Sequence, residues 1–198
     1  MLVDVTSLGP ELPDFEYSIH TIPRTHRDEV QAIFPTTSIE ELLVIPTCQK
    51  SAVDLVEWGD AAAQEKDRLL IRFQRLAKAA CESLIAQGYW ADYIDPCSGL
   101  PMVGIDLDRR GRALCPDSFV RPLARLLARQ VHKEGNTVYG EVQAMVTLLG
   151  YKTANAGCCS VLLHPRWGSS VYPASFFAKA PVDKVEHAIA SCRKSSLE

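Results

Sequence analysis

Residues 157 to 168 read Gly-Cys-Cys-Ser-Val-Leu-Leu-His-Pro-Arg-Trp-Gly, and the rest of the chain can be interpreted around them. Two adjacent thiols follow a glycine, a residue that permits positive φ and close backbone approach. The apolar run over residues 161 to 163 predicts a buried strand that anchors this corner to the core. A thiol is a soft ligand and, as the thiolate, a strong nucleophile, so this corner is the first candidate site.

The composition is that of an ordinary globular protein of one domain. Of the 198 residues 47% are hydrophobic and 23% are charged, with a formal net charge of −3. No run of like charge indicates a nucleic-acid partner, and no apolar run reaches the roughly 18 residues of a membrane helix. The seven cysteines are an odd number in a chain too long to need disulfide staples. Together with the absence of a secretory signal pattern, they predict reduced thiols and an intracellular protein.

The hydrophobic pattern predicts five strands, over residues 16–22, 41–47, 89–94, 161–164 and 170–178. Pro46 is expected to end the pairing of the second strand, and Pro173 to place the last strand at an edge or a bulge. The last two strands lie close enough in the chain to form a hairpin. Because no strand-helix-strand alternation recurs, the expected fold class is α+β, with a mainly antiparallel central sheet flanked by helices.

Helical periodicity predicts a long helix that Asp60 caps and Gly88 ends, with one apolar stripe formed by Leu69, Phe73, Leu76, Ala80 and Leu84. Shorter helices are expected over residues 25–34, between Thr137 and Gly150, and after Pro181. Residues 106–135 change character to a charged loop and an arginine-rich helix, which indicates a peripheral insertion. The chain is therefore expected to form a single domain over residues 15–192, after a flexible lead-in over residues 1–14.

The spacing of cysteines and histidines gives little support to other chemistry. Zinc-ligand pairs and the Cys-x-x-Cys of redox proteins are absent, and a bond between Cys158 and Cys159 would be strained. Burial of both thiols as small apolar groups is the plainer alternative. A Cys–His pair would need His164, His132 or His187. His164 is too far along an extended strand to reach the thiols, and a strand-end histidine bonded to the backbone explains it better.

Strand alternation separates the two thiols. Successive side chains face opposite sides, so Cys159 is expected to point inward with Val161 and Leu163. Cys158 would then be exposed beside Gly157. Motifs for nucleotide binding or serine hydrolysis are absent from the chain.

Two segments resemble the cobalamin-trafficking protein D family, the methylmalonic aciduria and homocystinuria type D proteins. One covers residues 88 to 100, which read Gly-Tyr-Trp-Ala-Asp-Tyr-Ile-Asp-Pro-Cys-Ser-Gly-Leu. The other is the Gly-Cys-Cys stretch over residues 157 to 168. Weaker similarity extends from about residue 16 to residue 185. The matching residues of structural or interface interest are Trp90, Asp92, Asp95, His164 and Trp167.

The resemblance implies a fold like that of the flavin-dependent nitroreductases, without bound flavin, and an adapter role rather than an enzyme. It implies a C-type cobalamin-processing chaperone as partner, whose cobalt takes a thiolate from the first cysteine of the Gly-Cys-Cys segment. That cysteine is Cys158, flanked by Gly157 and Cys159. The cobalamin, shared with the partner, would be directed to methionine synthase or methylmalonyl-CoA mutase. The expected location is cytoplasmic, or mitochondrial if an N-terminal extension precedes this chain.

Two alternatives from other classes stay open on the residues alone. A flavin-dependent reductase would need basic side chains around the phosphate of the flavin. The arginines of residues 106–135 could supply them only by folding over the site, and this segment is an insertion relative to the animal family members. A thiol-redox enzyme would use Cys158 and Cys159 as its reactive pair.

Overall fold

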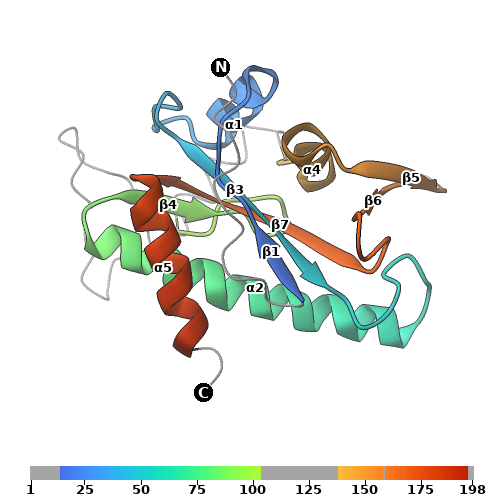
Figure 1. Cartoon of the computed structure of the whole chain (residues 1–198). Helices are drawn as coiled ribbons and strands as arrows, with labels where there is room; N and C mark the ends of the chain where they lie inside the picture. Colours follow the sequence, from blue (N-terminus) through green and yellow to red (C-terminus); the bar gives the residue numbers. More distant parts are fainter. Residues whose placement is uncertain (1–13, 104–137, 158, 196–198) are drawn as a thin grey trace.

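A computed structural model describes residues 14–103, 138–157 and 159–195 of the chain. In this part of the chain a central antiparallel sheet is flanked by helices, and a separate two-stranded ribbon lies at one end (Figure 1). The expected α+β class with an antiparallel sheet is confirmed. The proposed insertion at residues 106–135, Cys158 and all but the last residue of the lead-in lie outside the described residues.

The central sheet has the order β1-β3-β7-β4, and β2 also pairs with β3. Strands β3 and β7 form its centre and pair with each other from Leu43–Ala178 to Lys50–Val171. All the pairings are antiparallel. The strand bounds are β1 Phe15–Tyr17, β2 His20–Thr21, β3 Leu43–Lys50, β4 Trp90–Tyr93 and β7 Val171–Lys179.

Pro46 lies inside β3 and does not end its pairing, which corrects the expectation from the sequence. The N–H of Ser18 donates to the carbonyl of Pro46 at 3.2 Å, and β1 and β2 keep one register against β3 on either side of this point. A proline has no N–H with which to return the bond. The ladder is therefore interrupted between β1 and β2 without a slip in register.

Pro173 lies in β7, an internal strand, although an edge strand or bulge was expected. Its own position explains why it is tolerated. β4 pairs only with the last part of β7, from Phe176 to Lys179. At Pro173 the described residues therefore place only β3 beside the strand. A missing N–H is tolerated where a strand has only one neighbour. Pro173 therefore lies at a locally single-sided position, as an edge strand would provide, although β7 as a whole is an internal strand.

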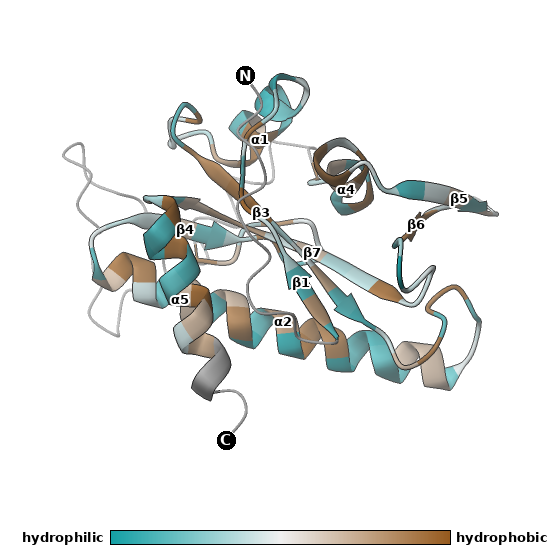
Figure 2. Cartoon of the chain, viewed as in Figure 1, coloured by the Kyte–Doolittle hydropathy of each residue, from teal (hydrophilic) through white to brown (hydrophobic). Residues whose placement is uncertain are grey.

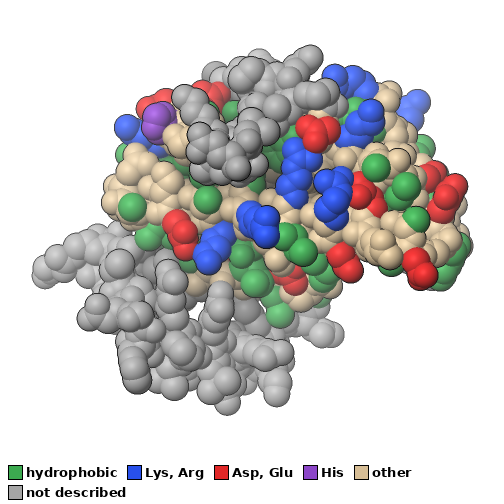
Figure 3. Space-filling model, turned by 90° about the horizontal axis from the view of Figure 1, so that it is seen from below, with side chains coloured by type: hydrophobic (Ala, Val, Ile, Leu, Met, Phe, Trp, Pro, Cys, Tyr) green, Lys and Arg blue, Asp and Glu red, His purple; other side chains and the backbone are tan. Residues whose placement is uncertain are grey.

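One face of the sheet is covered by α2 (Asp60–Ala86) and α5 (Val182–Ser195). The five residues of the predicted apolar stripe of α2 are buried, as are Val185 and Ile189 of α5. Figure 2 shows polar and apolar residues alternating along α2, as in an amphipathic helix. Gly59 occupies the N-cap without a side-chain bond, so Asp60 begins the helix and does not cap it. Figure 3 shows Lys and Arg side chains gathered in a band on the underside of the molecule.

The other face carries α1 (Arg27–Ile33), which follows the short turn η1 (Arg24–His26), and α4 (Glu141–Leu149). Alternation along the strands divides the core: Ile45 and Phe176 face α2 and α5, whereas Val44 and Phe177 face α1 and α4. The molecule thus has three layers. In the described part, no helix is long and apolar enough to span a membrane.

Candidate functional site

The Gly-Cys-Cys segment lies at the end of a β-ribbon formed by β5 (Lys152–Ala156) and β6 (Cys159–Leu163). Ala156 faces Cys159, so Gly157 and Cys158 alone connect the two strands. Gly157 has φ of +66°, a conformation that side chains with a Cβ rarely adopt and that two-residue hairpin connections require. The expected hairpin between residues 161–164 and 170–178 is wrong, because β6 pairs with β5 and not with β7.

The inward face of β6 differs from the expected one. Leu162 is 3% exposed, whereas Val161 and Leu163 are only half-buried. Leu162 packs with Met145 of α4 and with Val171 at the start of β7, and this contact fastens the ribbon to the body. The expectation that Val161 and Leu163 form the inward face is therefore wrong, and the inward orientation of Cys159, whose side chain is not among those described, stays a prediction.

His164 provides a polar anchor at the base of the ribbon. Its Nδ1 accepts from the backbone N–H groups of Arg166 and Trp167, each at 3.2 Å. Its Nε2 lies 2.8 Å from a carboxylate oxygen of Glu16 in β1 and 3.3 Å from the hydroxyl of Tyr151. Because Nδ1 accepts two N–H donors, the proton of the neutral ring lies on Nε2 and is donated to Glu16. The prediction of a strand-end histidine bonded to the backbone is confirmed.

Burial keeps this imidazole neutral. His164 is 3% exposed, and its burial lowers its pKa from 6.5 to about 4. Protonation would also place a second proton on Nδ1, where the two backbone N–H groups point. His164 is therefore a fixed connector between β1 and the ribbon and is not suited to act as a base near neutral pH.

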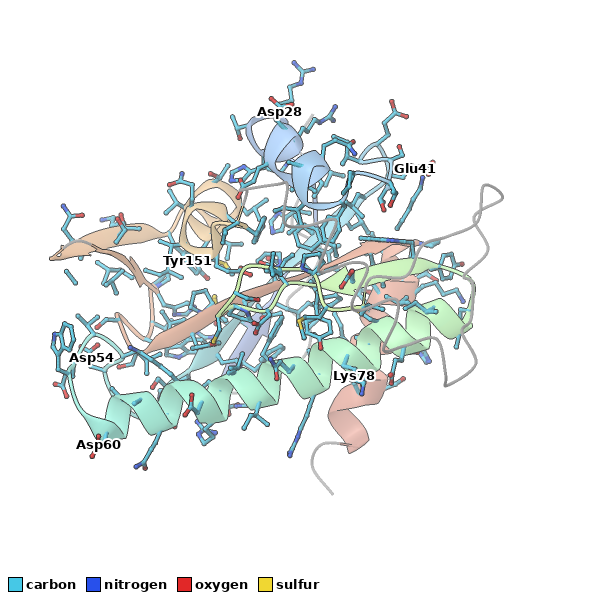
Figure 4. The ribbon with its side chains drawn as sticks, turned by 180° about the vertical axis from the view of Figure 1, so that it is seen from behind. Asp28, Glu41, Asp54, Asp60, Lys78 and Tyr151 are labelled. Carbon is cyan, nitrogen blue, oxygen red and sulfur yellow. The ribbon has the colours of Figure 1, made fainter. Side chains whose placement is uncertain are left out.

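Aromatic and charged groups enclose this anchor. The ring of Trp167 stacks on His164 with centroids 4.0 Å apart, and Tyr151 meets it edge-on at 5.1 Å. Arg166 pairs with Glu16 and lies over the Trp167 ring, its guanidinium carbon 5.3 Å from the centroid. Figure 4 shows Tyr151 at the point where α4 gives way to β5. Sequence reasoning identified His164 and Trp167 but missed Glu16, because nothing local in β1 indicates a partner 148 residues further on.

The other predicted residues, in the segment 88–100, lie elsewhere and organise structure. Trp90 is buried in the core and meets Phe34 edge-on at 5.1 Å. Asp92 accepts three backbone N–H bonds, from residues 93, 102 and 103. Asp95 closes the predicted turn by accepting from the N–H and hydroxyl of Ser98. The described contacts do not join these three residues to the His164 anchor.

The carboxyl of half-buried Glu141 holds α4 to β7. Glu141, the first residue of α4, accepts from the N–H of Ser175 at 3.0 Å and from its hydroxyl at 2.6 Å. Burial raises the pKa of Glu141 from 4.5 to about 7, partly offset by these two bonds. Sequence reasoning missed this residue. Helix α4 leads through Gly150 into β5, so this bond also helps place the ribbon.

Among the described residues, the thiols outside the Gly-Cys-Cys segment are poorly suited to form thiolates. The four described free cysteines are Cys48, Cys81, Cys97 and Cys192. Burial raises the pKa of each of them, and that of Cys48 reaches about 12 with the help of nearby Glu141. No group of three or more metal-ligating side chains occurs among the described residues. These four described thiols are therefore weak candidates for a metal-ligating thiolate.

Comparison with known proteins shows which family this chain resembles. Residues 9–110 match the family model of the methylmalonic aciduria and homocystinuria type D protein. The proteins named "Cobalamin trafficking protein CblD" of Rattus norvegicus and Homo sapiens are each 30% identical to this chain over 168 residues, and that of Gallus gallus is 28% identical. These alignments cover 85% of this chain and 47% of each relative. The chain thus spans about half the length of the curated relatives that it matches.

Proposed function

Because the chain belongs to the methylmalonic aciduria and homocystinuria type D protein family, we propose that it serves cobalamin trafficking as an adapter and not as an enzyme. Its relatives carry the name of a cobalamin trafficking protein. The observation that carries the proposal is the two-residue connection of Gly157 and Cys158 at the end of a ribbon whose described core contact is made by Leu162, near its base. A thiol there meets a cofactor held by another protein without opening the core.

In this proposal Cys158 gives a thiolate to the cobalt of cobalamin, and the C-type processing chaperone holds the cofactor. Cobalt is a metal that accepts soft sulfur donors, and ligation displaces the thiol proton. In this proposal the chain's own residues position the Cys158 thiol. Gly157 turns the backbone at positive φ, and Leu162 and His164 hold the base of the ribbon against the body.

The proposal extends to three further features of the family. The fold is of the nitroreductase kind but carries no flavin of its own. The cofactor passes on to methionine synthase or methylmalonyl-CoA mutase. The protein acts in the cytoplasm, where its thiols stay reduced.

Spectroscopy of the mixed proteins tests the proposal. Adding this chain to the cobalamin-loaded C-type chaperone should produce a visible band of sulfur-to-cobalt ligation. Cys158→Ser should abolish the band, because a hydroxyl is a poor donor to cobalt, and the neighbouring Cys159→Ser should retain it as the matched control. A band that survives in Cys158→Ser and disappears in Cys159→Ser would assign the ligand to the other thiol.

Two measurements separate this role from an enzymatic one. The purified protein should be colourless, and it should turn over glutathione disulfide only sluggishly, because Cys158 has no Cys-x-x-Cys partner. Flavin absorbance in the purified protein would favour a nitroreductase-like oxidoreductase. Rapid disulfide turnover that depends on both Cys158 and Cys159 would favour a thiol-redox enzyme.

A further inference from the structure

The outer edge of β5 carries backbone groups that no described strand pairs, because β5 pairs only with β6. In a hairpin with a two-residue connection, the closing residues exchange both of their hydrogen bonds, here Ala156 with Cys159. Alternate residues behave alike, so Lys152 and Ala154 also direct their N–H and C=O groups toward β6. Thr153 and Asn155 therefore direct theirs away from it. Such an edge is a template for a further strand.

The side chains of β5 permit close approach of another chain. Thr153, Ala154 and Asn155 are exposed, short and uncharged, so a strand can lie beside them at the usual spacing of about 4.8 Å. Natural edge strands are often blocked by a proline, a bulge or a central charge, and β5 has none of these. Lys152, its one charge, is exposed and has no carboxylate partner among the described residues.

The ribbon itself gains from a third strand. Two strands alone are marginally stable in water, and three or more with packing are needed for independent stability. Leu162 and His164 anchor β6 to the body. The first four residues of β5 are exposed, as expected for a strand that has a neighbour on one side only. The same edge runs directly into Gly157 and Cys158.

We propose that the partner protein adds an extended strand to the outer edge of β5, by hydrogen bonds to the backbone of Thr153 and Asn155. A carboxylate on that strand faces Lys152. This inference rests on the proposed function and deepens it, because strand addition sets the register of the ribbon tip against the cofactor that the partner holds. Backbone bonds supply the affinity and the Lys152 pair selects the strand.

Proline substitution tests the edge in the full chain, with the cobalamin-loaded C-type chaperone as the binding partner. Thr153→Pro removes an outward N–H, where a proline is compatible with the ribbon, and should weaken binding about tenfold or more. Thr153→Val keeps the N–H and is the matched control, with affinity close to that of the original chain. Lys152→Glu should weaken binding in a manner that high salt reduces, and Lys152→Met should weaken it less.

Amide hydrogen exchange tests the same edge without mutation. In the free chain the amide of Ala154 should be protected by β6, whereas those of Thr153 and Asn155 exchange rapidly. In the complex all three should be protected. Unchanged exchange at Thr153 and Asn155, with full affinity of Thr153→Pro, would overturn strand addition even if the sulfur-to-cobalt band forms. Protection in the free chain that rises with its concentration would also overturn it, in favour of pairing between two copies.

The failures of the two proposals can be told apart. If the original chain neither binds the loaded chaperone nor gives the sulfur-to-cobalt band, the adapter function itself is wrong. If binding and the band are both present but the edge of β5 stays open, only the strand-addition inference is wrong.

Discussion

At the scale of single residues, His164 shows how one side chain can join distant parts of the chain. Its ring contacts Glu16 of β1, the hydroxyl of Tyr151 and the backbone of the turn after β6. Sequence reasoning could predict the backbone bonds, because they lie two and three residues away. It could not predict Glu16, because that contact depends on where β1 lies in the finished sheet.

The lowered pKa of His164 predicts a loss of stability in acid. Between pH 6.5 and about 4 the unfolded chain takes up a proton that the folded chain refuses, so the free energy of unfolding falls as the pH falls through this window. The loss attributable to this group is up to about 3 kcal/mol. Urea unfolding at several pH values should show the original chain losing stability relative to His164→Asn, whose side-chain oxygen can still accept the two backbone N–H bonds.

The exposed His187 supplies the control for this measurement. His187→Asn should leave the pH dependence as it is in the original chain. A difference between the original chain and His164→Asn that stays constant from pH 7 to pH 4 would show that His164 is not held neutral by the fold.

At the scale of elements, prolines and exposed strands limited what the sequence could predict. The apolar stripe of α2 and the left-handed Gly150 after α4 follow from local pattern, and both are confirmed. The predictions based on Pro46 and Pro173 were wrong for the strands as a whole, because the sequence does not tell on which side of a proline a neighbouring strand lies. β5 was not predicted, since its sequence Lys-Thr-Ala-Asn-Ala buries almost nothing and has no apolar alternation.

The bond between α4 and β7 predicts a pH response of the opposite sign. The pKa of Glu141 is higher in the folded chain than the usual 4.5, so the folded chain holds a proton that the unfolded chain releases. The free energy of unfolding should therefore fall as the pH rises from 4.5 to about 7, by up to about 3 kcal/mol. Glu141→Gln can keep both contacts with Ser175 and should remove this decline, as measured by urea unfolding.

The exposed Glu57 provides a matched carboxyl for comparison. Glu57→Gln should leave the decline in place. If Glu141→Gln and Glu57→Gln follow the same pH profile as the original chain, the carboxyl of Glu141 ionises in the folded state as easily as it does in water.

At the scale of the whole molecule, the described residues form a main body in which a sheet carries helices on both faces. The sequence predicted this body well, because buried stripes and strands follow from composition and periodicity. It did not predict that the ribbon is separate from the central sheet, because the choice of strand partner depends on long-range geometry.

Removal of the proposed insertion should leave this body folded. Replacing residues 106–135 by a short linker should preserve a single cooperative transition in thermal unfolding, because the sheet and the helices α1, α2, α4 and α5 retain their mutual contacts. A complete loss of folding would show that Leu123, Leu126 and Leu127 belong to the main core.

The length of the ribbon sets the distance between its tip, at Gly157, and the body of the molecule. Each residue added to both β5 and β6 would lengthen it by roughly 3.4 Å and turn every outer side chain to the opposite face. Only even insertions, in steps of roughly 6.8 Å, keep Leu162 and the tip in their present orientation. The length of this ribbon can therefore change in evolution or by design only in discrete increments.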